Sequence, residues 1–241
     1  MHKISGAVTK AMYDFNMIED GDKIAVGVSG GKDSLALLSA LSYIKKFYDR
    51  SFDLIAIHID MGFEKAITDF DDYYSFIKAL GVELIIEKTR LYELIFKVRK
   101  EKNPCSLCSN MRRGALNSVA VKAGCNKLAL GHHSDDLIET FFLSLIYESR
   151  LSTFKPVSYL DRAGITVIRP LIYLSESKIT SLNLPSITSP CPANKNTKRQ
   201  YIKELLSRIY SETPKSRERI LNAVIHPERN NLWGLADFRD K

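Results

Sequence analysis

The chain has 241 residues, of which 45% are hydrophobic, and its 35 Lys and Arg against 28 Asp and Glu give a formal net charge of +7. This length fits one α/β domain with an appendage or two small domains, with a substantial buried core. No apolar run reaches the roughly 18 residues of a membrane span, and no signal peptide is recognisable, so we expect a cytoplasmic protein without membrane contacts. The basic balance favours a polyanionic partner such as RNA.

The first half of the sequence alternates apolar strands with helices. The pattern predicts strands at 24–28, 52–60 and 82–86 and helices over 3–17, 34–48 and 66–80. Gly81 follows the third helix as a typical C-terminal cap. Strands that alternate with helices indicate a parallel sheet with right-handed crossovers.

The second half starts with the same pattern and then becomes more polar. It predicts strands at 127–130 and 165–168, a helix over 134–147, and polar helices near 175–183, 198–211 and 215–226. The apolar face of the helix over 134–147 is expected to pack on the sheet. The predicted fold class is α/β, with a doubly wound, Rossmann-like parallel sheet in residues 1–173 and a helical C-terminal part in 174–241.

The segment from Ser29 to Ser34 reads Ser-Gly-Gly-Lys-Asp-Ser and lies between the first strand and the next helix. Glycines let backbone N–H groups approach a phosphate, and the helix N-terminus and Lys32 add positive charge. The segment is not a Walker loop, because Val26 and Asp33 stand where that pattern needs Gly and Ser or Thr. It indicates a phosphate-binding loop of another kind, with an ordinary glycine turn as the alternative.

Polar residues also follow two other strands, at Asp60 and over 131–136. Because ligands bind beyond the carboxyl ends of strands in open α/β sheets, these residues are expected to converge with the loop. The carboxylates that would suit a Mg-nucleotide site are Asp33, Asp60, Asp135 and Asp136. The alternative for residues 134–136 is that they cap a helix.

The chain has four cysteines, and two of them form a Cys-x-x-Cys pair, Cys105 and Cys108, at the expected start of a helix. The helix N-terminus and nearby arginines are expected to favour thiolates, which bind metals. Cys191, between two prolines, is a third candidate ligand, whereas Cys125 is expected in the core. Spacing alone leaves a zinc site, a redox pair, an iron-sulfur site and unrelated core cysteines open.

Taken together, the motifs resemble the tRNA 2-thiocytidine synthetases of the PP-loop ATP-pyrophosphatase superfamily. The resemblance covers about residues 20–210 and rests on the loop over 29–34, Cys105-Ser-Leu-Cys108 with Arg112-Arg113-Gly114, the segment 130–136, Ile168-Arg-Pro-Leu171 and Pro190-Cys191-Pro192. It implies an enzyme that adenylates the C2 oxygen of a cytidine, expected at position 32 of the anticodon loop, and replaces it with sulfur. ATP, Mg²⁺ and a 4Fe-4S cluster are the implied cofactors.

The resemblance also implies roles for individual residues. The expected nucleotide-binding residues are Gly27, Ser29, Gly30, Gly31, Lys32, Asp33, Ser34, His58, Asp60, Arg112 and Gly131. The expected cluster ligands are Cys105, Cys108 and Cys191, and the expected Mg²⁺ ligands are Asp33 and Asp135. Asp136 is the expected catalytic carboxylate, and Lys32 and the three cysteines also take part in the reaction.

The expected partners are tRNA and a sulfur donor such as a cysteine desulfurase, and the sequence also allows a homodimer. Basic residues on the C-terminal helices are expected to face tRNA phosphates, with a solvated helix face as the alternative: Lys195, Lys198, Arg199, Lys203 and Arg208. Two other functions remain open. One is a lysidine-type synthetase, which shares the ATP loop but needs no cysteines, and the other is a nucleotide-dependent RNA-binding or sulfur-carrier protein without turnover.

Overall fold

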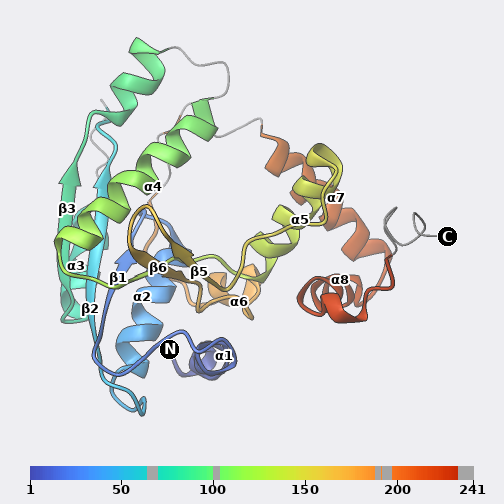
Figure 1. The fold of residues 1–241 in the computed structure, drawn as a ribbon, viewed down its shortest axis with the longest axis horizontal. Coiled ribbons are helices and arrows are strands. Elements are labelled where there is room, and N and C mark those ends of the chain that lie inside the picture. Colours follow the sequence, from blue (N-terminus) through green and yellow to red (C-terminus); the bar gives the residue numbers. More distant parts are fainter. Residues whose placement is uncertain (64–69, 100–103, 188–190, 192–196, 233–241) are drawn as a thin grey trace. The chain divides into compact units, whose positions relative to one another are not determined.

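The computed structural model describes residues 1–63, 70–99, 104–187, 191 and 197–232 (Figure 1). The chain divides into two compact units, one made of residues 1–135 and 155–197 and the other of 136–154 and 198–241. Each is described by itself. Within the described residues, no helix is both long and apolar enough to cross a membrane.

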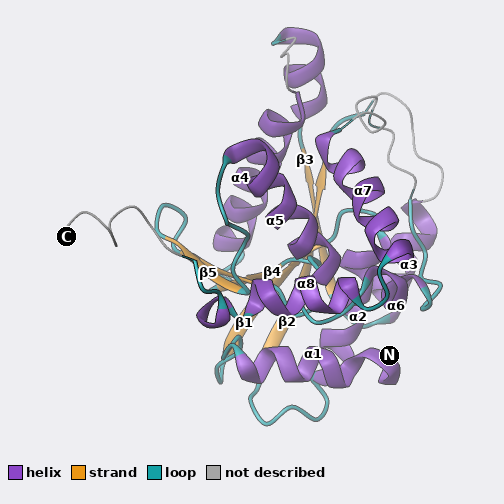
Figure 2. Ribbon diagram, turned by 90° about the vertical axis from the view of Figure 1, so that its right-hand side faces the viewer, coloured by secondary structure: helices purple, strands orange, loops and turns teal. Residues whose placement is uncertain are grey.

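The first unit contains a six-stranded sheet in the order β3-β2-β1-β4-β6-β5 (Figures 1 and 2). The strands are β1 (Asp22–Gly27), β2 (Phe52–Asp60), β3 (Glu83–Lys88), β4 (Lys127–Ala129), β5 (Val157–Leu160) and β6 (Ile165–Ile168). The pairs from β3 through β6 are parallel, and β1 lies at the centre with Ala25 opposite both Ile55 and Leu128. Only the edge strand β5 is antiparallel to its neighbour. The predicted Rossmann-like α/β fold is confirmed.

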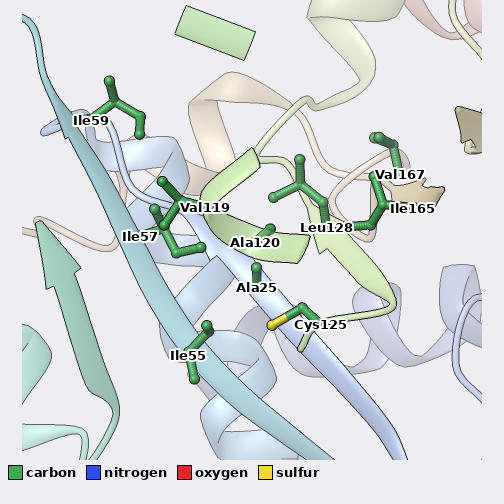
Figure 3. Packing of buried hydrophobic residues seen from close by; sticks show 10 residues of the cluster. All are labelled: Ala25, Ile55, Ile57, Ile59, Val119, Ala120, Cys125, Leu128, Ile165 and Val167. Carbon is green, nitrogen blue, oxygen red and sulfur yellow. The ribbon is translucent and has the colours of Figure 1, made fainter. Parts of the chain in front are cut away.

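Helices of the first unit cover both faces of this sheet, as parallel sheets require. They are α1 (His2–Asp14), α2 (Lys32–Ile44), α3 (Phe70–Ala79), the π-helix η1 (Glu93–Val98), α4 (Pro104–Lys122) and α6 (Glu176–Thr180). Val119 and Ala120 of α4 pack over Ala25 and Leu128 (Figure 3). Successive strand residues point to opposite faces, so the fully buried Val26 lies on the other side, where α2 packs against β1. Cys125, 5% exposed, belongs to the same core, as predicted.

The second unit is helical and contains α5 (Ser134–Glu148) from its third residue on, with α7 (Lys198–Glu212), α8 (Ser216–Ile225) and the short 3-10 helix η2 (Pro227–Arg229). Its core joins Ile138 of α5 to Ile202 and Leu206 of α7. Within this unit the face of α5 that was expected to pack on the sheet packs on α7, and Leu145 and Ile146 are exposed at 42% and 47%. Amphipathicity predicts a buried face but not the partner that buries it.

Two other features differ from the sequence prediction. The strand β5 follows a polar loop and has no apolar alternation strong enough to predict it. The expected domain boundary at residue 173 falls inside the first unit, in which α6 packs against α2.

Candidate nucleotide and cysteine site

The loop over 29–34 is closed by its own polar groups. The Ser29 backbone N–H donates to Oγ of Ser34 (3.2 Å), and that hydroxyl donates to the Gly31 carbonyl (2.9 Å). Gly30 has φ +88°, a left-handed conformation that side chains rarely adopt, and Gly31 is the N-cap of α2. The loop thus turns sharply from β1 into a helix whose first N–H groups have no intrahelical acceptor, the arrangement that binds phosphate.

Ser34 supports the loop from inside. Its side chain is buried, and its Oγ lies 3.1 Å from the hydroxyl of Tyr73, a fully buried residue of α3. Burial raises the pKa of Tyr73, while its hydrogen bonds to Ser34 and to the Gly30 backbone oppose that rise. Tyr73 was missed by sequence reasoning because it lies 39 residues from Ser34, with no local signal of the contact.

Gly131 lies where the end of β4 approaches the first turn of α2. A Cβ built on it would be 3.0 Å from the backbone carbonyl carbon and oxygen of Asp33 and 3.0 Å from the amide nitrogen of Ser34. A side chain at Gly131 would therefore displace the helix start itself. Gly27, at the end of β1, is packed against the side chains of Leu116 and Leu130.

Lys32, in the first turn of α2, is held between two carboxylates. Its Nζ lies 3.2 Å from Oδ1 of Asp33 and 3.1 Å from Oε1 of Glu176 on α6. Burial lowers the pKa of Lys32, but the hydrogen bond to Glu176 and the charge of Asp33 outweigh it, so that the net pKa is raised. Lys32 is therefore a cation at neutral pH, as phosphate binding requires. Glu176 was not predicted, because 144 residues separate it from Lys32.

The candidate Mg²⁺ ligands have different surroundings. Oδ1 of Asp33 is buried and accepts no well-aligned hydrogen bond from any described residue, but it lies 3.2 Å from Nζ of Lys32 and 3.9 Å from Nε2 of His133. A buried carboxylate oxygen of this kind fits a cation ligand. Oδ2 of Asp135 instead accepts the backbone N–H of Glu176 (2.7 Å), so Asp135 also caps the start of α6. Oδ1 of Asp60 accepts the backbone N–H of Gly62 (2.9 Å).

His58 and Arg112 lie within electrostatic reach of each other. The Nδ1–H of His58 donates to the Val28 carbonyl (2.9 Å) and so ties the end of β2 to the chain just before the loop. Burial lowers the pKa of His58, and the Arg112 charge lowers it further, against the opposing effects of Val28 and Asp60. The ring is thus neutral and rigidly placed beside the loop.

The three candidate cluster ligands all belong to the first unit. Cys105, in the first turn of α4, is exposed, whereas Cys108, one turn further on, and Cys191 are half-buried. Burial raises the pKa of Cys108, Arg112 lowers it, and the nearby Cys191 and Cys105 raise it again. Cys191 is thus close enough to Cys108 to act on its charge. The expectation that α4 and its arginines favour the thiolate is wrong for Cys108, because burial outweighs them.

The arrangement of these cysteines is looser than that of a finished metal site. Across the described part of the chain, no group of three His, Cys, Asp or Glu side chains is arranged to hold a metal ion. Three thiols in one compact unit, with two of them one helical turn apart, still form a donor set that suits iron-sulfur clusters. In chemistry, these three residues fit such a cluster.

Arg169, at the end of β6, is a further site residue, to which sequence reasoning gave no role although it lies in one of the motifs. Its Nε donates to Nδ1 of His132 (3.2 Å), and its guanidinium donates to the Lys155 carbonyl (2.6 Å). Burial lowers the pKa of Arg169 to about 10, and the Arg113 charge contributes to that lowering. Arg169 therefore fixes the ring of His132 next to Gly131.

In the second unit, Arg199 of α7 holds the expected catalytic carboxylate. Its Nη1 lies 3.3 Å from Oδ1 of Asp136 and 2.9 Å from Oε2 of Glu139. Arg199 is thus paired with carboxylates while its side chain stays 46% exposed, and its expected contact with tRNA phosphates stays a prediction. Lys198 lies over the Tyr147 ring (4.4 Å to the centroid), and Lys195 falls outside the described residues.

Comparison with known proteins agrees with this fold and loop. Residues 2–206 match the PP-loop domain family. The chain is similar to the tRNA-cytidine(32) 2-sulfurtransferase of Pelobacter propionicus (40% identity, covering 97% of this chain and 90% of the relative) and that of Azotobacter vinelandii (38%, covering 95% and 86%).

Two solved structures have related folds. The U34-tRNA thiolase NcsA of Methanococcus maripaludis, determined with its 4Fe-4S cluster, superposes with a TM-score of 0.74 at 25% identity, covering 94% of this chain and 79% of that one. The NH3-dependent NAD synthetase of Campylobacter jejuni matches in fold alone (TM-score 0.50, 16% identity, covering 94% and 93%).

The fold and the loop between β1 and α2 define the class: the chain is a PP-loop protein of the kind that uses ATP. Similarity along nearly the whole sequence then narrows the class. The chain belongs to the tRNA-cytidine(32) 2-sulfurtransferase family.

Proposed function

We propose that this protein is an ATP-dependent tRNA thiolase that converts cytidine 32 of the anticodon loop to 2-thiocytidine. The observation that carries the proposal is that one compact unit contains both the PP-loop, held by its own hydrogen bonds, and three cysteines, two of which lie one helical turn apart on α4. A PP-loop alone supports adenylation. The cysteines add a place for sulfur, which a simple adenylating ligase does not need.

The loop residues would bind and orient ATP. The N-terminal N–H groups of α2 and the cation of Lys32 would take the phosphates, and Lys32 would stabilise the charge that develops on the leaving pyrophosphate. Asp33 would bind Mg²⁺ through its buried Oδ1, with Asp135 as a second proposed ligand. Adenylation would turn the C2 oxygen of cytidine into a good leaving group, released with AMP.

Asp136 is the proposed catalytic carboxylate. Arg199 lies 3.3 Å from one of its oxygens and would supply a compensating charge while Asp136 takes part in proton transfer as sulfur replaces oxygen. Glu139, the other carboxylate on Arg199, differs in its surroundings: burial raises its pKa in spite of the arginine.

Cys105, Cys108 and Cys191 would hold the cluster. Held by these three thiolates, the cluster would supply the chemistry of sulfur transfer. The chain's own contribution is to place these thiols in the same unit as the ATP loop, with Arg112 in electrostatic reach of both Cys108 and His58. We further propose a cysteine desulfurase as sulfur donor, a cytoplasmic location and a homodimer.

The test is a reaction of the purified, anaerobically reconstituted protein with ATP, sulfide and tRNA that lacks the modification, followed by mass spectrometry of the nucleosides. We expect 2-thiocytidine at position 32, with pyrophosphate released in step. Lysidine in place of 2-thiocytidine would contradict the proposal in favour of a ligase. Absence of pyrophosphate would leave a nucleotide-dependent binding protein.

A further inference from the structure

Glu176 is the first residue of the short helix α6, and its backbone is held in place by the segment that follows β4. Its N–H donates to Oδ2 of Asp135 (2.7 Å). Two positions before it, the carbonyl of Leu174 accepts the backbone N–H of Ser134 (2.9 Å), and both of these residues are almost completely buried. Because α6 also packs against α2 in the same compact unit, the start of α6 is a fixed point beside the ATP loop.

The side chain at this fixed point contacts the ATP loop. Oε1 of Glu176 lies 3.1 Å from Nζ of Lys32, which belongs to the first turn of α2, and both side chains are half-buried. Lys32 reaches the carboxylate through a long, flexible stem, whereas the shorter Glu176 side chain starts from a hydrogen-bonded backbone. The more rigid partner sets the position of the more flexible one, so Glu176 holds Lys32 rather than the reverse.

The ammonium group of Lys32 has three N–H donors, and the fold uses two of them. One faces Glu176, and another faces Asp33, whose Oδ1 lies 3.2 Å from Nζ. The described residues offer this ammonium no other hydrogen-bond acceptor. The third donor therefore remains for an oxygen of a bound phosphate, and the two carboxylates together set its direction.

Loss of Glu176 would leave the ammonium group with a different partner. Among the described residues, Asp33 would be the one carboxylate still beside it, and Asp33 is the next residue of the chain, so Nζ would turn away from α6. A displaced cation stabilises a reacting phosphate less well, because this effect depends on charges that are already in place. Removal of Glu176 is therefore expected to slow the reaction.

The negative charge of Glu176 has a second effect, which acts on binding instead of rate. A carboxylate close to the ATP phosphates repels them, so its removal should leave nucleotide affinity the same or make it higher. The N–H groups at the start of α2, which would bind the phosphates, are untouched by Glu176. The two effects can thus be told apart, since one acts on kcat and the other on Kd.

We propose that Glu176 is a positioning residue for the adenylation step, which holds the ammonium of Lys32 where the charge of the leaving pyrophosphate develops. The proposal rests on the proposed function, which gives that charge to Lys32 to stabilise. In this step the C2 oxygen of cytidine forms a bond to the α-phosphorus of ATP. The bond from that phosphorus to the bridging oxygen breaks, and its electron pair leaves with pyrophosphate. Glu176 acts on the step through Lys32.

The experiment uses the full-length protein with its reconstituted cluster, under anaerobic conditions, with Mg²⁺, sulfide and tRNA that lacks the modification. Release of pyrophosphate at varied ATP concentrations gives kcat, and calorimetry gives the Kd of a non-hydrolysable ATP analogue. For Glu176→Ala we expect kcat to fall about tenfold, with a Kd that is unchanged or lower. An unchanged kcat would overturn the proposal, and so would a kcat and an affinity that fall together, because that result indicates general damage to the loop.

Further variants separate positioning from a structural role of α6. Glu176→Gln keeps an oxygen acceptor for Lys32 but loses the charge, so its kcat should fall only about threefold. Formate added to Glu176→Ala should restore part of kcat, because a small carboxylate fits the space that the side chain leaves. Lys178→Ala, at an exposed position of the same helix, is the matched control and should keep the wild-type kcat.

Should Glu176→Ala fail to fold, Glu176→Gln decides: a kcat equal to that of the wild type would overturn the proposal. If both variants fold, equal loss of kcat in the two, without rescue by formate, would also overturn it.

The outcomes distinguish this proposal from the proposed function. A wild-type protein that releases no pyrophosphate with ATP and tRNA overturns both. A wild-type protein that forms 2-thiocytidine, and whose Glu176 variants keep the full kcat, overturns only the role of Glu176. Pyrophosphate release that depends on Glu176 but yields another nucleoside supports the role of Glu176 and contradicts the proposed function.

Discussion

The ATP loop and the cysteine group lie in the same compact unit, but they differ in how far the fold completes them. The loop is closed by hydrogen bonds to Ser34, supported by the buried Tyr73, and packed against Gly131 without room for one more carbon atom. The cysteines share a region, but no set of three metal-binding side chains among the described residues is in place for a metal. The nucleotide site is formed by folding alone, whereas the cluster site is finished by its metal.

The difference follows from where each site obtains its stabilisation. The loop lies at the carboxyl edge of the sheet, where the ends of β1 and β4 fix its backbone. Cys108 lies on α4, whereas Cys191 comes from a distant part of the chain that follows α6. Burial raises the pKa of the Cys108 thiol. Thiols in that state gain their main stabilisation as thiolates bound to a metal.

The largest effect is expected for Cys191→Ala. Because the third ligand is lost, the variant should take up no stable cluster and should form no 2-thiocytidine, while its nucleotide affinity equals that of cluster-free wild type. Iron and sulfide analysis, visible absorbance and nucleoside mass spectrometry measure this. Cys125→Ala is the matched control: it removes a core thiol at a cost of about 1 kcal/mol and should keep the cluster. A full cluster in Cys191→Ala would break the comparison.

Gly131→Ala should damage the preformed site. The added methyl group would meet backbone atoms of Asp33 and Ser34 at 3.0 Å, so the start of α2 must shift. We expect the affinity for an ATP analogue to fall about tenfold, which is about 1.4 kcal/mol. The control is Gly6→Ala on α1, where the new Cβ has nothing within 4 Å and helix propensity favours Ala by about 1 kcal/mol. Undiminished affinity in Gly131→Ala would show that the loop is less rigid than described.

Tyr73→Phe removes the hydroxyl that supports Ser34. We expect a loss of about 1 kcal/mol in the free energy of unfolding and a rise of a few-fold in the KM for ATP, with the KM for tRNA unchanged. Denaturant titration and steady-state kinetics measure these. Tyr74→Phe, one residue away in the same helix, is the control because its ring lies in an aromatic group with His58 and Phe70. Equal effects of the two changes would argue against a role of the Tyr73 hydroxyl in the loop.

The smallest effect concerns His58. Burial lowers its pKa below the ordinary 6.5, so between these two values the unfolded chain binds more protons than the folded protein. The free energy of unfolding therefore decreases as the pH falls below about 6.5, because protonation of His58 favours the unfolded chain. Thermal unfolding from pH 7.5 to 5.5 should show a smaller decline for His58→Gln than for wild type.

The local parts of this protein were predictable from sequence, and the contacts between distant residues were not. The strand Phe52–Asp60 was predicted to the residue, because its apolar run and flanking polar residues are local signals. The ion pair of Arg199 with Asp136 was not predicted, because the two residues are 63 positions apart and a charged residue on a helix gives no local signal of its partner. The influence of Cys191 on Cys108 likewise joins residues that are distant in the sequence, so it has no local signal either.

Because Cys125 is buried, occupancy of the cluster can be measured by alkylation of the other cysteines, independently of the colour of the protein. The other three thiols are exposed or half-buried, whereas Cys125 is enclosed by the sheet and α4. An alkylating reagent should therefore add to three cysteines of the native metal-free protein and to none when they are ligated. The mass of the intact chain then distinguishes molecules with a cluster, which carry no adduct, from molecules without one, which carry three, within a single sample.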